Sequence, residues 1–451
     1  MSDLLSIGRS GVVAYRAALS TVGENVSNAE TEGYTRRTVT LKESAISTSN
    51  DYRYRSTAVF GGVNIGSVQR VFDNYRTAYA RLATSEAGRA DVKATWLDTA
   101  EGALDDSQVG LGVKMSAVFT SAEALSTDVS SDTNRRAVLS ALTDATFQFN
   151  NTSTALKSVA EGLATTAENT VNKLNADLKT LAQININLRR ASPGSASQAL
   201  LQDQRDAALQ QISGAIGINV RLQNDGEAEV RLIGNDAVKL VDPAEVNAAF
   251  IGLIQGNDGR LSLVASGLGT QQAIVAQTGG LAGYTDAANS IAARREALDE
   301  TAAKFADVIN SWNQAGIDGA GNAGVPLISG TAAATLTVAT SDPSKVAAAA
   351  TSGVANGNAL ALKDTRNASG PEAKWALIVS THAQAVAAAK AEQSATAGHK
   401  DGALQQLDEV TGVDLDVEAA QLLRFQQAYS GSARIIQVAR DTLQEIFSLF
   451  R

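Results

Sequence analysis

The stretch "SNAETEGYTRR", Ser27 to Arg37, decides how this chain begins to fold. It follows a segment whose apolar and small residues step alternately by three and four positions, the spacing of a coiled-coil seam. Gly33 can supply a turn with positive φ, so the stretch ends a helix and redirects the chain. The seam comprises Leu5, Gly8, Val12, Tyr15, Leu19, Val22 and Val26.

The C-terminal segment repeats this pattern. A helix with so wide an apolar surface must bury it against a partner. Because both ends of the chain carry a seam, the simplest partner of each is the other. The C-terminal seam comprises Leu422, Phe425, Tyr429, Ser432, Ile436, Ala439, Leu443, Ile446 and Phe450, and a second stripe adds Leu423, Ile435, Val438, Thr442 and Leu449.

The overall charge and the missing residue types exclude several classes of function. The 451 residues carry a net charge of −9, which argues against nucleic acid as the main partner. The chain has no cysteine, so it can form no disulfide, thiolate nucleophile or cysteine-bound metal site. It shows neither a secretory signal nor a run of about eighteen apolar residues. We therefore expect either a cytoplasmic protein or one exported without a cleaved signal.

The middle of the chain predicts a helical rod. From about Thr133 to Arg190 it has no proline and a single glycine, and a continuous helix of that length would span roughly 80 Å. The stretch "ASPGSAS" ends this helix, and residues 200–216 are interpreted as an antiparallel return helix. One apolar stripe runs along the rod through Leu156, Ala160, Leu163, Ala167, Val171, Leu174, Leu178, Leu181 and Leu188, with Asn185 as the polar interruption.

Residues 217–283 change to the period of two that is typical of strands. Two hairpins are predicted here, around Asn224-Asp225-Gly226 and Asn257-Asp258-Gly259. Helix is expected again over 285–313, followed by a loop and a short strand at "TLTVAT". Further helices are expected over 345–350 and 375–390.

These elements predict a mainly α fold with an inserted antiparallel β domain. The chain should be elongated, with both termini at one end and the insertion at the other. Three domains are expected: a terminal coiled-coil assembly domain from 1–40 with 405–451, a helical rod from 41–216 with 284–404, and an outward-facing β domain over 217–283. Residues 326–370 could add a small lobe to the rod.

Candidate catalytic or metal-binding groups are few. No phosphate-binding, dinucleotide, zinc-protease or hydrolase signature occurs, so we expect neither an enzyme nor a cofactor. His382 and His399 lie too far apart for a helical metal pair and are interpreted as packing or surface residues. Asp318 and Asn322 lack the ligand spacing of a calcium loop, which favours a tight surface turn.

Two charged clusters are interpreted as structural. Asp203, Arg205 and Asp206 suggest a solvated helix face. The cluster of Tyr52, Arg53, Tyr54 and Arg55 has the composition of a surface that stacks on single-stranded nucleic acid. In an acidic chain with a single such cluster, a protein interface or an edge strand is favoured.

Both ends of the chain resemble a known family. Asn25, Asn28, Thr31, Gly33, Tyr34 and Arg36 are similar to the N-terminal signature of bacterial flagellar axial proteins, and Arg37 stands where glutamine is common. The stretch "TGVDLDVEAAQLLRFQQAYSGSARII", Thr411 to Ile436, resembles their C-terminal signature. Within that family the middle resembles the hook-associated protein 1 (FlgK) group, through "QDQRDAALQQIS", "NSWNQAGIDGAGNAG" and "DPSKVAAAA".

The resemblance implies a structural protein that joins the flagellar hook to the filament. It implies a ring of copies of the chain at the hook tip, with the hook protein and the second junction protein as partners and an export chaperone on the C-terminal helix. The mechanism would be folding coupled to assembly, in which the terminal helices order on docking. It also implies an extracellular location in the flagellum, reached without a cleaved signal.

The seams and the signature residues together define a candidate assembly interface. It comprises Leu5, Val12, Tyr15, Leu19, Val22, Val26, Asn28, Thr31, Gly33, Tyr34, Arg36, Leu422, Phe425, Tyr429, Ile436, Leu443, Ile446 and Phe450.

Three rival interpretations stay open. A flagellar hook or distal rod protein would share both ends but should have a β-rich middle. A helical membrane-active toxin would need an apolar hairpin, which is not visible. A glycan-acting enzyme would need paired carboxylates in a cleft, whereas the acidic residues of 217–283 are scattered.

Overall fold

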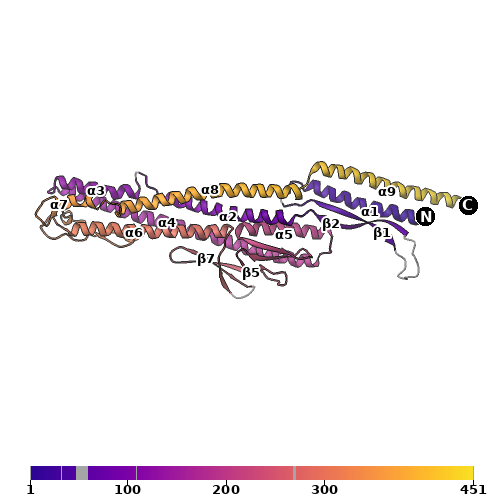
Figure 1. Ribbon diagram of the computed structural model, residues 1–451, viewed down its shortest axis with the longest axis horizontal. Coiled ribbons are helices and arrows are strands. Elements are labelled where there is room, and N and C mark those ends of the chain that lie inside the picture. The colour runs from indigo at the N-terminus through magenta and orange to yellow at the C-terminus, as the bar shows by residue number, and fades with distance from the viewer. Residues whose placement is uncertain (1, 32, 47–58, 108, 268–270, 450–451) are drawn as a thin grey trace.

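The protein is long and narrow, with both termini at the same end (Figure 1). A computed structural model describes residues 2–31, 33–46, 59–107, 109–267 and 271–449. A terminal arm holds the two chain ends, and a helical rod extends away from it. Within the described residues, no helix is both long and apolar enough to cross a bilayer.

The terminal arm is an antiparallel helix pair with a two-stranded sheet beside it. Helix α1 (Ser2–Ser27) packs along α9 (Leu415–Leu449), so each chain end is the other's partner, as the two seams predict. Strand β1 (Arg37–Ile46) pairs antiparallel with β2 (Val59–Arg70), and both strands contact α1. No pattern recognised in the sequence predicts this sheet.

The rod consists of long helices packed side by side. The central helix α4 (Asp132–Arg190) has 59 residues, and its N-terminus is capped by Ser131, whose side chain accepts a hydrogen bond from Asn134 N. Every residue of its predicted apolar stripe is buried, which confirms the long helix. Around it lie α2 (Asn74–Ala103), α3 (Leu111–Thr127), α5 (Ala196–Ala215), α6 (Gly280–Gln314) and α8 (Pro371–Thr411).

Residues 316–365 form short elements at the far end of the rod. The predicted helix over 345–350 is wrong. Asn313 binds the backbone there instead, donating to Lys345 O at 3.0 Å and accepting from Ala347 N at 2.8 Å, so these groups need no helical partners. The elements are β9 (Gly316–Ile317), β10 (Ile328–Ser329), η1 (Ala333–Thr335), β11 (Thr337–Val338), η2 (Pro343–Lys345), β12 (Ala349–Ala350), α7 (Gly357–Ala361) and η3 (Leu362–Thr365).

This far-end segment shares a core with the rod. Its buried side chains, including Leu327, Leu336 and Leu362, pack in one cluster with residues of α3, α4, α6 and α8. A segment that has no core of its own cannot fold as a separate lobe.

The inserted residues form two three-stranded antiparallel sheets. Both predicted hairpins are confirmed, with Gly226 at φ 92° and Gly259 at φ 88° in their turns. One sheet has the order β3 (Ile218–Leu222), β4 (Ala228–Leu232), β5 (Asn235–Val241). The other has the order β6 (Phe250–Gln255), β7 (Leu261–Ser266), β8 (Gln272–Ile274).

The expected position of the insertion, at the end opposite the termini, is wrong. The sheets lie against the side of the rod, along its half nearer the arm, and α3 and α7 occupy the far end (Figure 1). Their buried residues share a core with the C-terminal half of α4, which also packs against the return helix α5.

Two asparagines of α4 fasten the sheets to the rod. Asn185 donates to Ala228 O and accepts from Ala228 N, both at 2.9 Å. Asn175 makes the same pair of bonds with Ile251, at 2.9 and 2.8 Å. Each side-chain amide therefore occupies the place that a backbone amide of another strand would take.

Candidate functional site

The candidate site is the terminal arm, where α1 and α9 meet through small residues. Gly8 lies so close to α9 that an added Cβ would sit 2.6 Å from Ile436 Cγ1 and 3.2 Å from Ser432 O. Gly11 is equally crowded by the Ser432 side chain. Buried Ala14 and Ala18 continue this face toward the end of α1. The absence of bulky side chains lets the two helices approach closely.

Larger apolar residues close the interface toward the rod. Phe425 is 9% exposed and packs with buried Val22, and its ring centroid lies 6.4 Å from that of Tyr15. Leu19 and Leu422 complete this cluster. The two seams therefore find a partner within one chain.

The other predicted seam residues lie at the edges of the interface. Val26 is 44% exposed, because an α-helix drifts away from a strict seven-residue seam and Asn25 takes the buried position instead. Phe450 lies outside the described residues. Leu5, Val12, Tyr429, Ile436, Leu443 and Ile446 are half-buried.

Asn25 organises the turn that follows α1. Its Oδ1 accepts hydrogen bonds from Tyr34 OH at 2.8 Å and Arg37 N at 3.0 Å. Its Nδ2 donates to Arg37 O at 2.9 Å and to Glu418 Oε2 at 3.1 Å. The amide is thus fully bonded in a buried position, where an unmet polar group would be costly.

The remaining signature residues shape the turn itself. Thr31 N donates to Asn28 O at 2.9 Å and Tyr34 N donates to Thr31 O at 3.0 Å. Gly33 adopts φ 77°, the left-handed conformation predicted for it. Asn28 and Thr31 therefore set the path of the chain and are not themselves in the α1–α9 contact.

The two terminal signatures meet at Glu418. Arg36 Nε donates to Glu418 Oε1 at 2.7 Å, and the carboxylate is only 1% exposed. Arg36 N also donates to Thr411 O at 2.9 Å. Residues from opposite ends of the sequence thus form one buried cluster at the base of the arm.

Tyr34 is held in its neutral form within this cluster. Burial raises the pKa of Tyr34 to about 12, although the nearby Arg37 guanidinium opposes the rise. That guanidinium lies 4.9 Å from the ring centroid. The phenol therefore keeps its proton and donates a hydrogen bond to Asn25 Oδ1.

A second ionic cluster joins the arm to α5. Arg37 Nη2 lies 2.8 Å from Asp203 Oδ2, Arg70 Nε lies 2.7 Å from Asp203 Oδ1, and Arg70 Nη2 lies 2.8 Å from Asp206 Oδ2. The interpretation of these acids as a solvated helix face is wrong. The β1–β2 sheet covers that face of α5 and buries Asp203 and Arg205.

Other residues singled out from the sequence have structural positions. His382 is buried and shares a hydrogen bond of 2.9 Å between its Nε2 and Leu97 O. Asp318 accepts from Ala320 N and Asn322 N, forming the predicted tight turn, but its side chain is buried. Tyr52, Arg53, Tyr54 and Arg55 lie outside the described residues.

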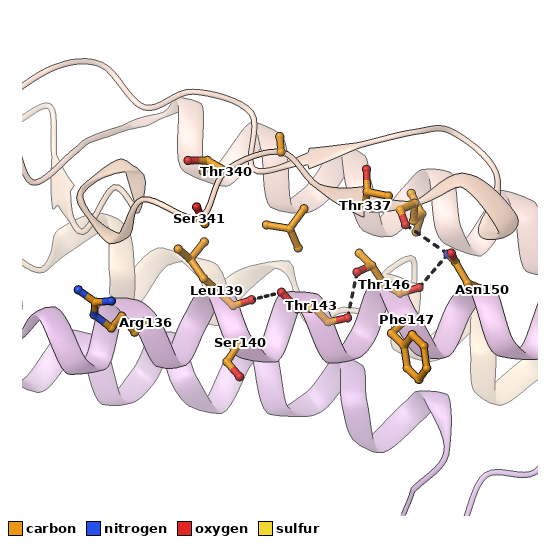
Figure 2. A pocket seen from close by; sticks show the side chains of 13 residues that line it. Arg136, Leu139, Ser140, Thr143, Thr146, Phe147, Asn150, Thr337, Thr340 and Ser341 are labelled. Atoms are coloured by element: carbon orange, nitrogen blue, oxygen red, sulfur yellow. Dashed lines mark hydrogen bonds between the residues drawn. The ribbon is translucent and has the colours of Figure 1, made fainter.

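A groove of about 640 Å³ lies at the far end of the rod (Figure 2). It runs between α4 and the chain around Thr337, where Asn150 donates to Ala333 O and Leu336 O. Arg136 is the one charged residue of its lining and is paired with Asp132. In the part of the chain that the structure describes, no three acidic or histidine side chains are placed to share a metal ion.

Comparisons with known proteins agree with the geometry of the arm and the rod. The flagellar hook-associated protein FlgK helical domain matches residues 97–328, slightly more than half of the chain. The flagellar basal body rod FlgEFG protein C-terminal domain matches residues 404–449.

Individual relatives carry the same name. The chain is 26% identical to flagellar hook-associated protein 1 of Bacillus subtilis, over 98% of this chain and 97% of the relative. It is 26% identical to the Escherichia coli protein of that name, but spans 59% of that longer chain.

A solved structure shows the same fold. The flagellar hook junction protein FlgK from Burkholderia pseudomallei superposes with a TM-score of 0.66 at 14% identity, covering 74% of this chain and all of that one. Together with the family match over more than half of the residues, this places the chain in the FlgK family of flagellar hook-associated proteins.

Proposed function

We propose that this chain is a structural junction protein of the bacterial flagellum. It assembles as a ring at the hook tip and links the hook to the filament through its terminal helices. The observation that carries the proposal is the arm, in which one apolar face of α9 is covered by α1 and a second face is left open.

The open face is formed by three residues of the second stripe of α9. Leu423, Ile435 and Val438 are 59%, 38% and 60% exposed. Covering one such side chain contributes about 1.5–3 kcal/mol, so a neighbouring copy that covers the stripe would stabilise a ring. Several large apolar side chains left exposed on one helix favour an interaction site.

Each domain has a separate role in this proposal. The arm, which holds α1, the β1–β2 sheet and α9, makes the contacts between copies and continues the hook structure. The rod, which holds α2–α5 and α6–α8, forms the layer outside it, and the β domain over 217–283 faces solvent. The hook protein and the second junction protein are the expected neighbours along the flagellar axis.

Before assembly, the same open stripe needs cover. An export chaperone that holds the C-terminal helix would supply it, and docking in the flagellum would then replace the chaperone. In its assembled state the chain lies outside the cell. Its role is architectural and requires no catalysis.

The hook or distal rod protein is the alternative within the same family of axial proteins. The C-terminal match to rod proteins is common ground between the two proposals. The middle of the chain favours the junction protein, because residues 130–215 form α4 and α5 and not the β-rich body that a hook protein would have.

The test is a substitution on the open stripe in a strain that lacks the native chain. Val438→Asp should leave the purified protein folded, because Val438 is already exposed, but should abolish motility and filament attachment. Leu377→Asp is the matched control, since Leu377 is 65% exposed on α8 in the rod. Normal motility in the Val438→Asp strain would contradict the proposal.

Phe425→Asp and Leu443→Asp test the covered face in the same assay. Phe425→Asp places a charge in the buried cluster between α1 and α9, and Leu443→Asp places one at a half-buried position of α9, so incorporation should stop while the rod stays folded. Circular dichroism of the purified variants would show whether the rod helices remain.

A further inference from the structure

The boundary between the arm and the rod is narrow. The chain crosses it through residues 71–73, between β2 and α2, and through 412–414, between α8 and α9. Among the helices and strands that the structure describes, the main contact across this boundary is β2 against α5. Two backbone hydrogen bonds also cross it, from Val68 N to Gly194 O at 2.8 Å and from Arg36 N to Thr411 O at 2.9 Å.

The contact between β2 and α5 is ionic where it is buried. Arg37 is the first residue of β1 and Arg70 is the last of β2, and the two are directly paired across the sheet. Like charges facing each other across a sheet repel. Asp203 of α5 offsets this repulsion, because each of its carboxylate oxygens forms an ion pair with one of the two arginines.

The rod side of the contact is held rigidly. Asp206 accepts from Arg70 at 2.8 Å and from Arg205 Nε and Nη2 at 2.9 and 2.7 Å. Arg205 in turn donates to Gly226 O in the β3–β4 turn. The Asp206 carboxylate is therefore held in place through Arg205 by both α5 and the β domain.

We propose that Arg37, Arg70, Asp203 and Asp206 form a clasp that sets the direction of the terminal arm relative to the rod. With the clasp closed, the arm lies along the rod axis. With it open, the arm turns about residues 71–73 and 412–414 while α1 and α9 stay paired. This control of direction is a property of the single chain and does not depend on the proposed assembly.

The clasp depends most on Asp203 and Arg37. Removing the Asp203 charge takes away both attractions and leaves two facing arginines unscreened in a buried site. Arg37 is the link that reaches directly from the end of the α1 turn, because Asn25 holds its backbone at both N and O. Loss of its charge therefore removes the ionic link from this turn to α5, beside which Thr35 Oγ1 also donates to Asp203 Oδ1.

The absence of native cysteine gives a direct test. Ser20→Cys on α1 and Ser394→Cys on α8 are exposed sites for two spin labels, one on each side of the boundary. The distance distribution between the labels should be narrow in the otherwise unchanged chain. Arg37→Gln and Asp203→Asn should each broaden it several-fold, and Arg37→Lys should restore part of the narrow peak.

A matched control lies inside the rod. Arg89→Gln removes an ion pair with Asp286 between α2 and α6, and should leave the distance distribution unchanged. A second label pair, on α1 and α9 at Ser20→Cys and Gln437→Cys, should stay narrow in every variant, which separates turning of the arm from its unfolding.

Three results would overturn the proposal. The first is a broad distribution between Ser20 and Ser394 in the parent, which would mean that the arm has no fixed direction. The second is a narrow distribution in both Arg37→Gln and Asp203→Asn, which would mean that other contacts set it. The third is broadening of the α1–α9 label pair in Arg37→Gln, which would assign the ion pairs to holding the helix pair together.

Discussion

The rod and the terminal arm bury their apolar residues in different ways. In the rod, α4 contributes leucines that are fully buried along its whole length, among neighbours of similar size. In the arm, α1 and α9 meet through glycine, alanine and serine and through a small cluster around Phe425, while Leu423 and Val438 stay exposed. The rod therefore carries a complete core, whereas the arm leaves apolar surface exposed in the single chain.

Substitution in the rod core should have the largest effect on stability. Phe149 of α4 is fully buried and its ring centroid lies 5.5 Å from that of Phe305. Phe149→Ala should lower the free energy of unfolding by about 3–5 kcal/mol, because it removes a large side chain and leaves a cavity. Denaturant unfolding followed by circular dichroism would measure this loss. A loss below about 1 kcal/mol would show that the core collapses to fill the space.

Crowding the arm should have a smaller and local effect. Gly8→Val forces a side chain into Ile436 and the α9 backbone, an overpacking that costs about 1–3 kcal/mol. Limited proteolysis should then remove the arm and leave the rod intact. Gly23→Ala is the control, since a Cβ at Gly23 meets no atom within 4 Å. Rapid digestion of the rod in Gly8→Val would contradict the independence of the two regions.

The difference between the regions also explains which elements could be predicted. The helix α4 was predictable because its leucines recur with helical spacing. The sequence of helix α2 has only a weak hydrophobic periodicity. Its buried face is mostly alanine, such as Ala80, Ala83 and Ala90, and alanine differs little in hydrophobicity from the residues around it. The helix wrongly expected over 345–350 shows that alanine-rich composition alone does not decide between helix and turn.

The candidate site was predictable at its ends and not at its centre. The seams and the signature turn follow from spacing within short segments, and Gly33 follows from the conformation that it alone adopts easily. The ion pairs of Arg37 and Arg70 with Asp203 join residues more than 130 positions apart, so no local sequence pattern predicts them. Because no sequence pattern predicts the β1–β2 sheet, the sequence alone indicates an exposed position for Asp203.

Loss of a sheet fastener should have an effect comparable to crowding the arm, but confined to the rod. Asn185→Ala leaves Ala228 N and O without partners in a buried position. This should cost about 1–3 kcal/mol and speed amide hydrogen exchange in β4. Exchange in β4 that stays at the native rate would show that the sheet does not depend on Asn185.

Acid should weaken the rod through His382. Burial lowers the pKa of His382 from its usual 6.5, Arg294 lowers it further, and Glu101 and the bond to Leu97 O oppose them. The unfolded chain then takes up a proton more readily, so stability is full above about pH 6.5 and falls as the pH drops below it. His382→Gln should reduce this slope in thermal melts, while the exposed His399→Gln should keep it. Equal slopes in His382→Gln and the parent would exclude this role.

The smallest effect is expected at an exposed ion pair of the rod. Arg136 and Asp132 are paired at 2.7 Å with side chains 68% and 63% exposed. Arg136→Gln should change the free energy of unfolding by at most about 0.5 kcal/mol, because solvent screens the pair. A larger change in denaturant unfolding would mean that the far end of the rod relies on surface charge.

The paired bonds of Asn175 and Asn185 have a consequence for how this chain can diverge. Both asparagines form hydrogen bonds with the backbone of a strand, and a backbone amide is the same whatever side chain its residue carries. The outer faces of the two sheets can therefore exchange residues freely without loosening their seat on α4. Related chains can therefore differ in the exposed residues of these sheets while the helices beneath them keep the same sequence pattern.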